Sequence, residues 1–183
     1  MTVLISLLIA GIVVVLDRVT KNIVLAAMTE GESVTVLPGV LRWTYIENSG
    51  AAFGMLKDHR WVFLVFSVIM IAAVFGYIVW KYPVKKQPVE WLELISLSAI
   101  VGGGIGNMID RIMRGSVVDF VDVICFPFWK FIFNVADMFV TCGCFLLIFT
   151  LIRSEMREAK KRRTAADATD EEENKDDPAG TDK

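Results

Sequence analysis

The chain is poor in the residues that bind metals or form disulfide bonds: its 183 residues include one histidine and three cysteines. Cys142 and Cys144 lie two positions apart in an apolar run, and Cys125 stands alone, so the sequence shows neither a disulfide framework nor a zinc-binding spacing. The single histidine, His59, has no companion ligands at a metal-binding spacing. These shortages argue against a structural metal and a zinc hydrolase, and we expect no cofactor.

Charge is also scarce, because charged residues make up 22% of the chain and apolar residues 55%, with a mean hydropathy of +0.54. This is too apolar for an ordinary soluble domain of this size, and it argues against a nucleic-acid-binding protein. Residues 1–152 carry 11 basic and 11 acidic residues, 153–163 carry 6 and 2, and 164–183 carry 2 and 8. We predict a membrane domain over 1–152 and a tail over 153–183, with 164–183 disordered.

Long apolar runs predict four transmembrane helices, since a span needs roughly 20 apolar residues. Trp61–Trp80 is uncharged, Phe131–Ile152 carries one charge, and Leu94–Ile109 reaches full length when Pro88–Glu93 is included. The first run, Val3–Met28, could instead be a cleaved signal peptide. No basic stretch precedes this run, and a charged helical stretch continues past its apolar part, so an uncleaved span is favoured.

The placement of lysine and arginine predicts the orientation of these helices. Lys81–Glu90 and Arg153–Arg163 together hold 9 basic residues in 21 positions, whereas Thr29–Arg60 and Asp110–Lys130 hold 6 in 53. The denser side is expected to face the cytoplasm. Both termini are therefore predicted inside, and the two longer loops outside.

The first of these outer loops carries its own structural signals. Ser33–Val36 and Leu41–Tyr45 alternate between polar and apolar residues around a Pro38-Gly39 turn, which predicts two short strands. Ala51–Leu56 is typical of a short interfacial helix. The predicted fold is an all-α membrane protein of four transmembrane helices, with a small extracytoplasmic β-sheet cradle and that interfacial helix.

Several ionisable residues fall at membrane depth, where they are costly unless paired or functional. Asp17 and Lys21 are four apart on one helical face, and an internal ion pair is favoured over a catalytic role. Asn107 and Arg111 are also four apart, with Asp110 beside them. For this group a polar helix end and a binding site are equally supported.

Four glycines cluster in the third span, at positions 102, 103, 104 and 106. A phosphate-binding loop is one interpretation, but no Lys-Ser/Thr follows and the cluster lies inside a span. Close packing of helices is favoured.

Asp119 and Asp137 are the candidate catalytic pair, because the predicted topology puts both on the outer side at similar depth. Two carboxylates held together at low dielectric share one proton, so one can deprotonate water while the other protonates a substrate. No serine or cysteine nucleophile with an adjacent base competes. Their separation of 18 residues through a loop expected to be irregular is weak support. A catalytic pair is only slightly favoured over a buried structural pair.

Five short blocks that contain most of these polar residues occur in order along 1–152. They are Asp17-Arg18-Val19-Thr20-Lys21, Asn48-Ser49-Gly50-Ala51-Ala52-Phe53, Gly106-Asn107-Met108-Ile109-Asp110-Arg111, Val117-Val118-Asp119-Phe120 and Phe133-Asn134-Val135-Ala136-Asp137. With these blocks the sequence resembles the prolipoprotein signal peptidase (signal peptidase II) family of bacterial membranes.

The resemblance implies an aspartyl endopeptidase that removes the signal peptide from prolipoproteins by cleaving before the diacylglyceryl-modified cysteine. It implies Asp119 and Asp137 as the catalytic dyad. Residues that it implies in contact with substrate or the inhibitor globomycin are Asn48, Gly50, Asn107, Arg111 and Asn134, with Asp17, Lys21 and Asp110 in support. The sequence departs from the family at Met138, where a small hydroxyl residue is common, and in its acidic tail.

The expected partners are lipidated prolipoproteins and membrane lipids, with no nucleic acid, for a monomer in the bacterial cytoplasmic membrane whose site faces the outer leaflet. One alternative is an ion- or proton-coupled transporter, although no inverted repeat is apparent and both aspartates lie at one membrane face. A second is a presenilin-type protease, which needs Gly-x-Gly-Asp where this chain has Gly104-Ile105-Gly106-Asn107. A third is a structural membrane subunit with paired carboxylates.

Overall fold

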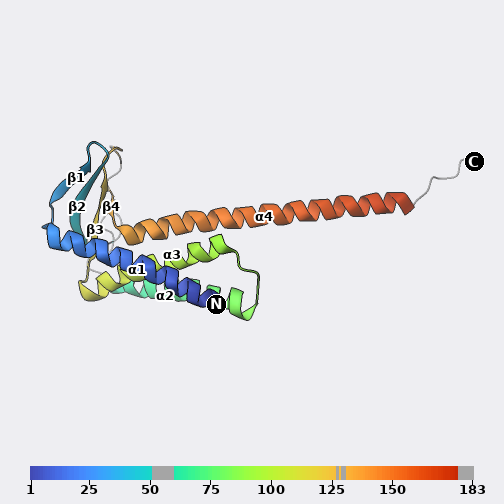
Figure 1. The fold of residues 1–183 in the computed structure, drawn as a ribbon, viewed down its shortest axis with the longest axis horizontal. Coiled ribbons are helices and arrows are strands. Elements are labelled where there is room, and N and C mark those ends of the chain that lie inside the picture. The colour runs from blue at the N-terminus through green and yellow to red at the C-terminus, as the bar shows by residue number, and fades with distance from the viewer. Residues whose placement is uncertain (51–59, 127, 129–130, 177–183) are drawn as a thin grey trace, which may run out of the picture.

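Four long helices form most of the protein in the computed structural model, which describes residues 1–50, 60–126, 128 and 131–176 (Figure 1). Each is long and apolar enough to cross a membrane, as predicted. Helix α3 is packed against the other three. The helices are α1 (Thr2–Ala27), α2 (Arg60–Val79), α3 (Trp91–Met113) and α4 (Val135–Asp176), and α2 continues into a π-helical turn, η2 (Trp80–Val84).

The glycine cluster lets α3 approach its neighbours closely, which confirms the packing interpretation. A Cβ added at Gly102 would lie 2.7 Å from the Ala10 carbonyl oxygen of α1. One added at Gly103 would lie 2.5 Å from the Ala136 carbonyl oxygen of α4. In a bilayer the hydrophobic effect does not drive helices together, so they associate through the close van der Waals packing that small residues permit.

A four-stranded antiparallel sheet caps one end of the bundle (Figure 1). Its order is β1 (Ser33–Leu37), β2 (Leu41–Asn48), β3 (Val117–Val123) and β4 (Ile132–Phe133). The two strands predicted in the first loop are confirmed. The segment between α3 and α4 is not irregular as expected, because β3 and β4 complete the sheet. The predicted helix over 51–56 lies outside the described residues.

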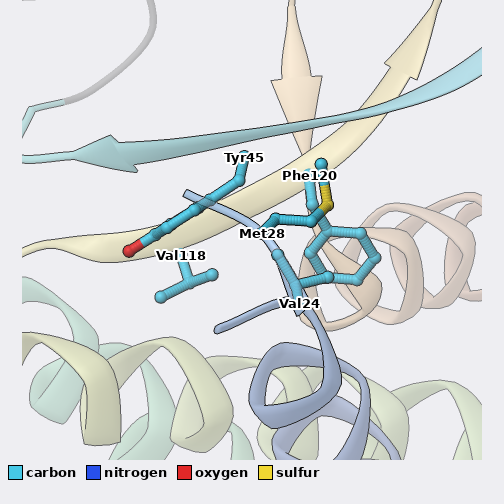
Figure 2. Close-up of a cluster of buried hydrophobic side chains, with 5 residues drawn as sticks. All are labelled: Val24, Met28, Tyr45, Val118 and Phe120. Atoms are coloured by element: carbon cyan, nitrogen blue, oxygen red, sulfur yellow. The ribbon is translucent and has the colours of Figure 1, made fainter. Parts of the chain in front are cut away.

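An apolar cluster fixes the sheet to the end of α1 (Figure 2). Val118 and Phe120 of β3 are buried there, and the Phe120 ring meets Trp43 of β2 edge to face at 5.8 Å. Successive side chains of a strand point to opposite faces. Burying 118 and 120 against α1 therefore turns Asp119 to the other face. The members of the cluster are Val24, Met28, Tyr45, Val118 and Phe120.

Helix α4 continues well beyond the bundle (Figure 1). The tail from 164 was expected to be disordered, but the helix extends to Asp176. An existing helix can be extended without the cost of a new nucleus, and alanine, glutamate and lysine are good helix formers. The expectation of disorder considered only the lack of apolar side chains and neglected this continuation.

Candidate active site

Asp119 is held by two amide side chains on the face of the sheet opposite Val118 and Phe120. Only 2% of its surface is exposed. The Asn48 side-chain amide of β2 donates to its Oδ2 at 3.0 Å, and the Asn134 amide donates to its Oδ1 at 2.6 Å. Asn48 lies diagonally across the β2–β3 ladder from Asp119, because Asn48 pairs with Val117 and Ile46 pairs with Asp119. The strand register itself thus brings the amide to the carboxylate.

Asp137 is positioned by the first turn of α4. Asn134 precedes the helix, and its Oδ1 accepts from the Asp137 backbone N–H at 3.0 Å. In return, the Asp137 Oδ2 accepts from the Asn134 backbone N–H at 3.3 Å. This is a reciprocal capping box with aspartate in place of glutamate at the third helical position. A local helix-start signal therefore fixes the orientation of a candidate catalytic carboxylate.

Asn107 and Asn134 connect the two carboxylates. Asn134 donates from one amide nitrogen both to Asp119 and, at 3.1 Å, to the Asn107 Oδ1. Asn107 donates from its own amide to the Asp137 Oδ1 at 2.7 Å. The chain Asp119–Asn134–Asn107–Asp137 joins β3, the start of α4 and α3 in one polar network.

Behind this network lies a fully buried lysine with three acceptors. The Lys21 ammonium is 2.9 Å from the Asp17 Oδ2, 2.8 Å from the Asp110 Oδ2 and 3.0 Å from the Asn107 Oδ1. Two ion pairs and the hydrogen bond to Asn107 thus compensate the buried charge of Lys21. Because Lys21 donates to the Asn107 oxygen, the Asn107 amide nitrogen faces Asp137.

Asp17 and Asp110 each make a further contact that ties this group to the site. The Asp17 Oδ1 accepts from the Ala136 backbone N–H of α4 at 3.1 Å. Asp110 pairs with Arg18 and accepts from the Val118 backbone N–H at 3.3 Å. Sequence reasoning missed Arg18, although a third charge beside Asp17 inside a span was itself a signal.

Both carboxylates line a cavity of about 330 Å³ at the sheet end of the bundle. Arg111 also lines it, and its guanidinium lies over the Phe63 ring of α2, 5.3 Å from the centroid. The Gly50 backbone N–H donates to the Asn48 Oδ1 at 3.1 Å, which orients the amide that contacts Asp119. Asn134, expected to contact substrate, is fully buried and lies outside the lining, as do Asp17, Lys21 and Asp110. The lining is formed by Asn48, Gly50, Asn107, Arg111, Val117, Asp119, Phe131, Ile132, Phe133, Asp137, Val140 and Thr141.

The environment of Asp119 favours its protonated form. Burial and, to a smaller extent, the charge of Asp137 raise its pKa from 3.8 to about 7, against the lowering effect of the Asn48 and Asn134 hydrogen bonds. A carboxyl with a pKa near neutrality can donate a proton at physiological pH. Within the described residues, no cluster of three or more histidine, cysteine, aspartate and glutamate side chains could hold a metal ion.

Fold and site together define a helical membrane protein with two coupled carboxylates in a polar cavity. The sequence model of the signal peptidase (SPase) II family matches residues 9–153. A lipoprotein signal peptidase of Halalkalibacterium halodurans is 40% identical over 159 residues, covering 86% of this chain and 97% of that protein. One from Listeria monocytogenes serotype 4a is 43% identical over 136 residues, covering 74% and 85%.

Solved structures agree with this match. A bacterial membrane enzyme solved by the in meso method has a TM-score of 0.74 and 34% identity, covering 82% of this chain and 88% of its own. A second has a TM-score of 0.71 and 35% identity, covering 80% and 91%. The chain therefore belongs to the signal peptidase II family and is a membrane peptidase.

Proposed function

We propose that this membrane peptidase uses Asp119 and Asp137 as an aspartyl dyad to remove the signal peptide from prolipoproteins, before the diacylglyceryl-modified cysteine. Prolipoprotein processing follows from the family and its curated relatives. The observation that supports the dyad is that both carboxylates line one cavity while a pair of asparagine amides connects them.

The two carboxylates have different roles in the proposed reaction. Asp119, with its raised pKa, begins protonated and donates to the leaving amide nitrogen. Asp137 begins ionised, held by the Asn107 amide and the Asn134 backbone N–H, and accepts a proton from the attacking water. The water oxygen bonds to the scissile carbonyl carbon, the C–N bond breaks, and the dyad ends with its proton on Asp137.

The other lining residues suit a peptide bound in extended form. Arg111 is a cationic donor, and the asparagine amides are neutral donors for backbone carbonyl oxygens. We place the cavity at the outer leaflet of the bacterial cytoplasmic membrane, with 1–152 as the peptidase domain and 153–183 as a cytoplasmic tail. The acyl chains of the substrate then remain dissolved in the bilayer. A monomer suffices, since every residue of the proposed site comes from one chain.

The test is turnover of lipidated and unlipidated prolipoprotein by purified Asp119→Asn and Asp137→Asn variants. Each substitution preserves volume but removes the shared proton, so turnover should fall about 100- to 10,000-fold while lipidated precursor still binds. The double variant should be scarcely slower than either single variant, because cooperating groups are not additive.

Asp122→Asn is the matched control, since Asp122 lies on the same strand but pairs with Arg42 and does not line the cavity. It should retain turnover. Near-normal turnover in either dyad variant would remove that residue from the mechanism. Equal cleavage of both precursors would contradict the lipidated substrate.

A further inference from the structure

A second polar pocket, of about 350 Å³, lies at the end of the bundle opposite the sheet. It is enclosed by η2, the start of α3 and the part of α4 that follows its apolar run. Figure 1 shows the start of α3 at this end of the bundle, far from the sheet. Glu93 lines the pocket and Asp110 lies near the dyad, so at 1.5 Å per residue α3 separates the two polar sites by about 25 Å. That is close to the thickness of the hydrocarbon layer, so each site lies at one membrane interface.

The pocket contains a buried carboxylate that is only partly satisfied. Glu93 is 4% exposed, and its Oε2 accepts from Lys81. Tyr77 interacts with the same carboxylate, but within the described residues the Glu93 Oε1 has no hydrogen bond of normal geometry. A buried carboxylate oxygen left in this state is costly, and a ligand that donates a hydrogen bond would relieve the cost.

The facing wall supplies cations. Arg153, Arg157 and Lys161 recur every four residues and so share one face of α4, and all three line the pocket. They are exposed, and no salt bridge engages them within the described part of the chain. Leu92 and Leu151 give the pocket an apolar edge. Exposed Trp91 and Trp80 near this end are typical of the headgroup region.

We propose that this pocket binds the headgroup of an anionic glycerophospholipid of the phosphatidylglycerol type. The phosphodiester lies on Arg153, Arg157 and Lys161, where charge-assisted hydrogen bonds to phosphate form. A headgroup hydroxyl donates to the Glu93 Oε1, and the acyl chains pass over the apolar edge into the bilayer. Only the membrane fold is needed for this site, which makes it independent of the proposed dyad.

The experiment measures lipid binding to the purified full chain in detergent by native mass spectrometry. Phosphatidylglycerol is compared with phosphatidylcholine, which has the phosphate but no hydroxyl donor, and with free glycerol phosphate. In the Arg153→Gln/Arg157→Gln variant, affinity for phosphatidylglycerol should fall about tenfold or more. Peptidase turnover in lipid-free detergent should stay unchanged.

Lys160→Gln/Arg163→Gln is the matched control, because it removes the same charge from the same helix at residues outside the pocket lining. It should lose no more than about twofold, because neither residue contacts the headgroup in the proposed site, whereas general attraction to an anionic surface would weaken equally in both variants. Equal losses of affinity in the two variants would show that general electrostatic attraction explains the binding, and this would overturn the proposal. Equal binding of phosphatidylcholine, or glycerol phosphate binding as tightly as the lipid, would also overturn it.

Discussion

At the scale of single residues, the structure divides the polar side chains of the site by the surface they contact. Asp119, Asp137, Asn107 and Asn48 line the cavity, whereas Lys21 and its two carboxylate partners are buried behind it. The sequence blocks contain all of these residues, but Asn134, which was expected to contact substrate, is fully buried outside the lining, and none of the contacts was predicted. Lys21 and Asn107 are 86 positions apart, and helix spacing cannot reveal a bond across such a separation.

The first prediction concerns stability and pH. The folded-state pKa of Asp119 is raised from 3.8 to about 7, so between these values the folded state binds more protons than the unfolded state. Stability from this group is therefore present at low pH and falls as pH rises through the window. Between pH 5 and pH 7 the loss should be about 2 kcal/mol.

Thermal unfolding in detergent at a series of pH values measures this loss. The parent protein should show a falling Tm from pH 5 to pH 7, and Asp119→Asn should lack that part of the slope. An identical pH profile in Asp122→Asn and the parent would support the assignment. An identical profile in Asp119→Asn and the parent would contradict it.

The second prediction concerns the Asp17–Lys21 pair. An isolated i, i+4 pair tolerates exchange of its two charges, but here Asp17 also accepts from the Ala136 N–H and Lys21 also binds Asp110. Combining Asp17→Lys with Lys21→Asp would place a cation against a backbone N–H and two carboxylates side by side. The exchange should therefore fail, with a stability loss of about 3–5 kcal/mol, the range for a broken buried pair.

The matched control is the exposed pair Glu158 and Arg162, which has the same spacing and a 3.7 Å separation. Exchanging its charges should change Tm little, because exposed pairs contribute about 1 kcal/mol or less. Protein yield, Tm and turnover are measured for both exchanges. Recovery of parent stability in the Asp17–Lys21 exchange would show that the pair acts alone.

At the scale of elements, α3 is the support for the site. Its glycines let α1 and α4 approach closely enough for Lys21 to reach Asn107 and for Asn107 to reach Asp137. Gly106 shows this directly, because a Cβ there would lie 2.7 Å from the Asp17 Oδ2. The close packing of the helix backbones therefore determines the geometry of the polar network.

The third prediction follows from Gly103. In Gly103→Ala the new methyl group would meet the Ala136 carbonyl oxygen at 2.5 Å, and backbone cannot move aside cheaply. The first turn of α4 should shift and take Asp137 with it. We expect overpacking to cost about 1–3 kcal/mol and turnover to fall by a larger factor than stability alone explains.

Gly76→Ala on α2 is the control, because nothing lies within 4 Å of the new Cβ. It should be neutral or slightly stabilising, since alanine is the better helix former. Tm and turnover are compared for the two variants at equal protein level. Full activity in Gly103→Ala would show that α4 does not depend on this contact.

Elements were predictable where one local pattern determined them, and not where context did. Hydropathy located the four spans, and alternation located β1 and β2. Val117–Val123 shows no such alternation, because its two aspartates are three positions apart, and local pattern therefore did not predict β3. The capping box at Asn134 was also readable, yet its link to Asp119 and Asn107 requires the folded arrangement of three elements.

At the scale of the whole molecule, the two ends of the bundle differ in chemistry. The sheet end holds the carboxylate cavity. The other end holds the second polar pocket and the projecting part of α4 (Figure 1). The N-terminus lies at this second end as well (Figure 1). The orientation of the helix bundle in the membrane therefore determines which aqueous phase each site faces.

The last prediction is that orientation. Lys81–Glu90 and Arg153–Arg163 place 9 basic residues at the second end, and retaining them in the cytoplasm is favoured during insertion. The sheet, and with it the proposed peptidase site, should then face outward. Cysteines introduced at Thr35 on β1 and at Lys160 on α4, both exposed, test the two faces separately.

Cys125, Cys142 and Cys144 are free and exposed, so all three are first replaced by serine and the resulting protein is checked for turnover. A membrane-impermeant maleimide should label position 35 but not 160 in intact cells, and both after permeabilisation. Labelling of position 160 but not of position 35 would show that the protein has the opposite orientation in the membrane. That orientation would place the carboxylate cavity in the cytoplasm and not at the outer leaflet, and the proposed function would fail with it.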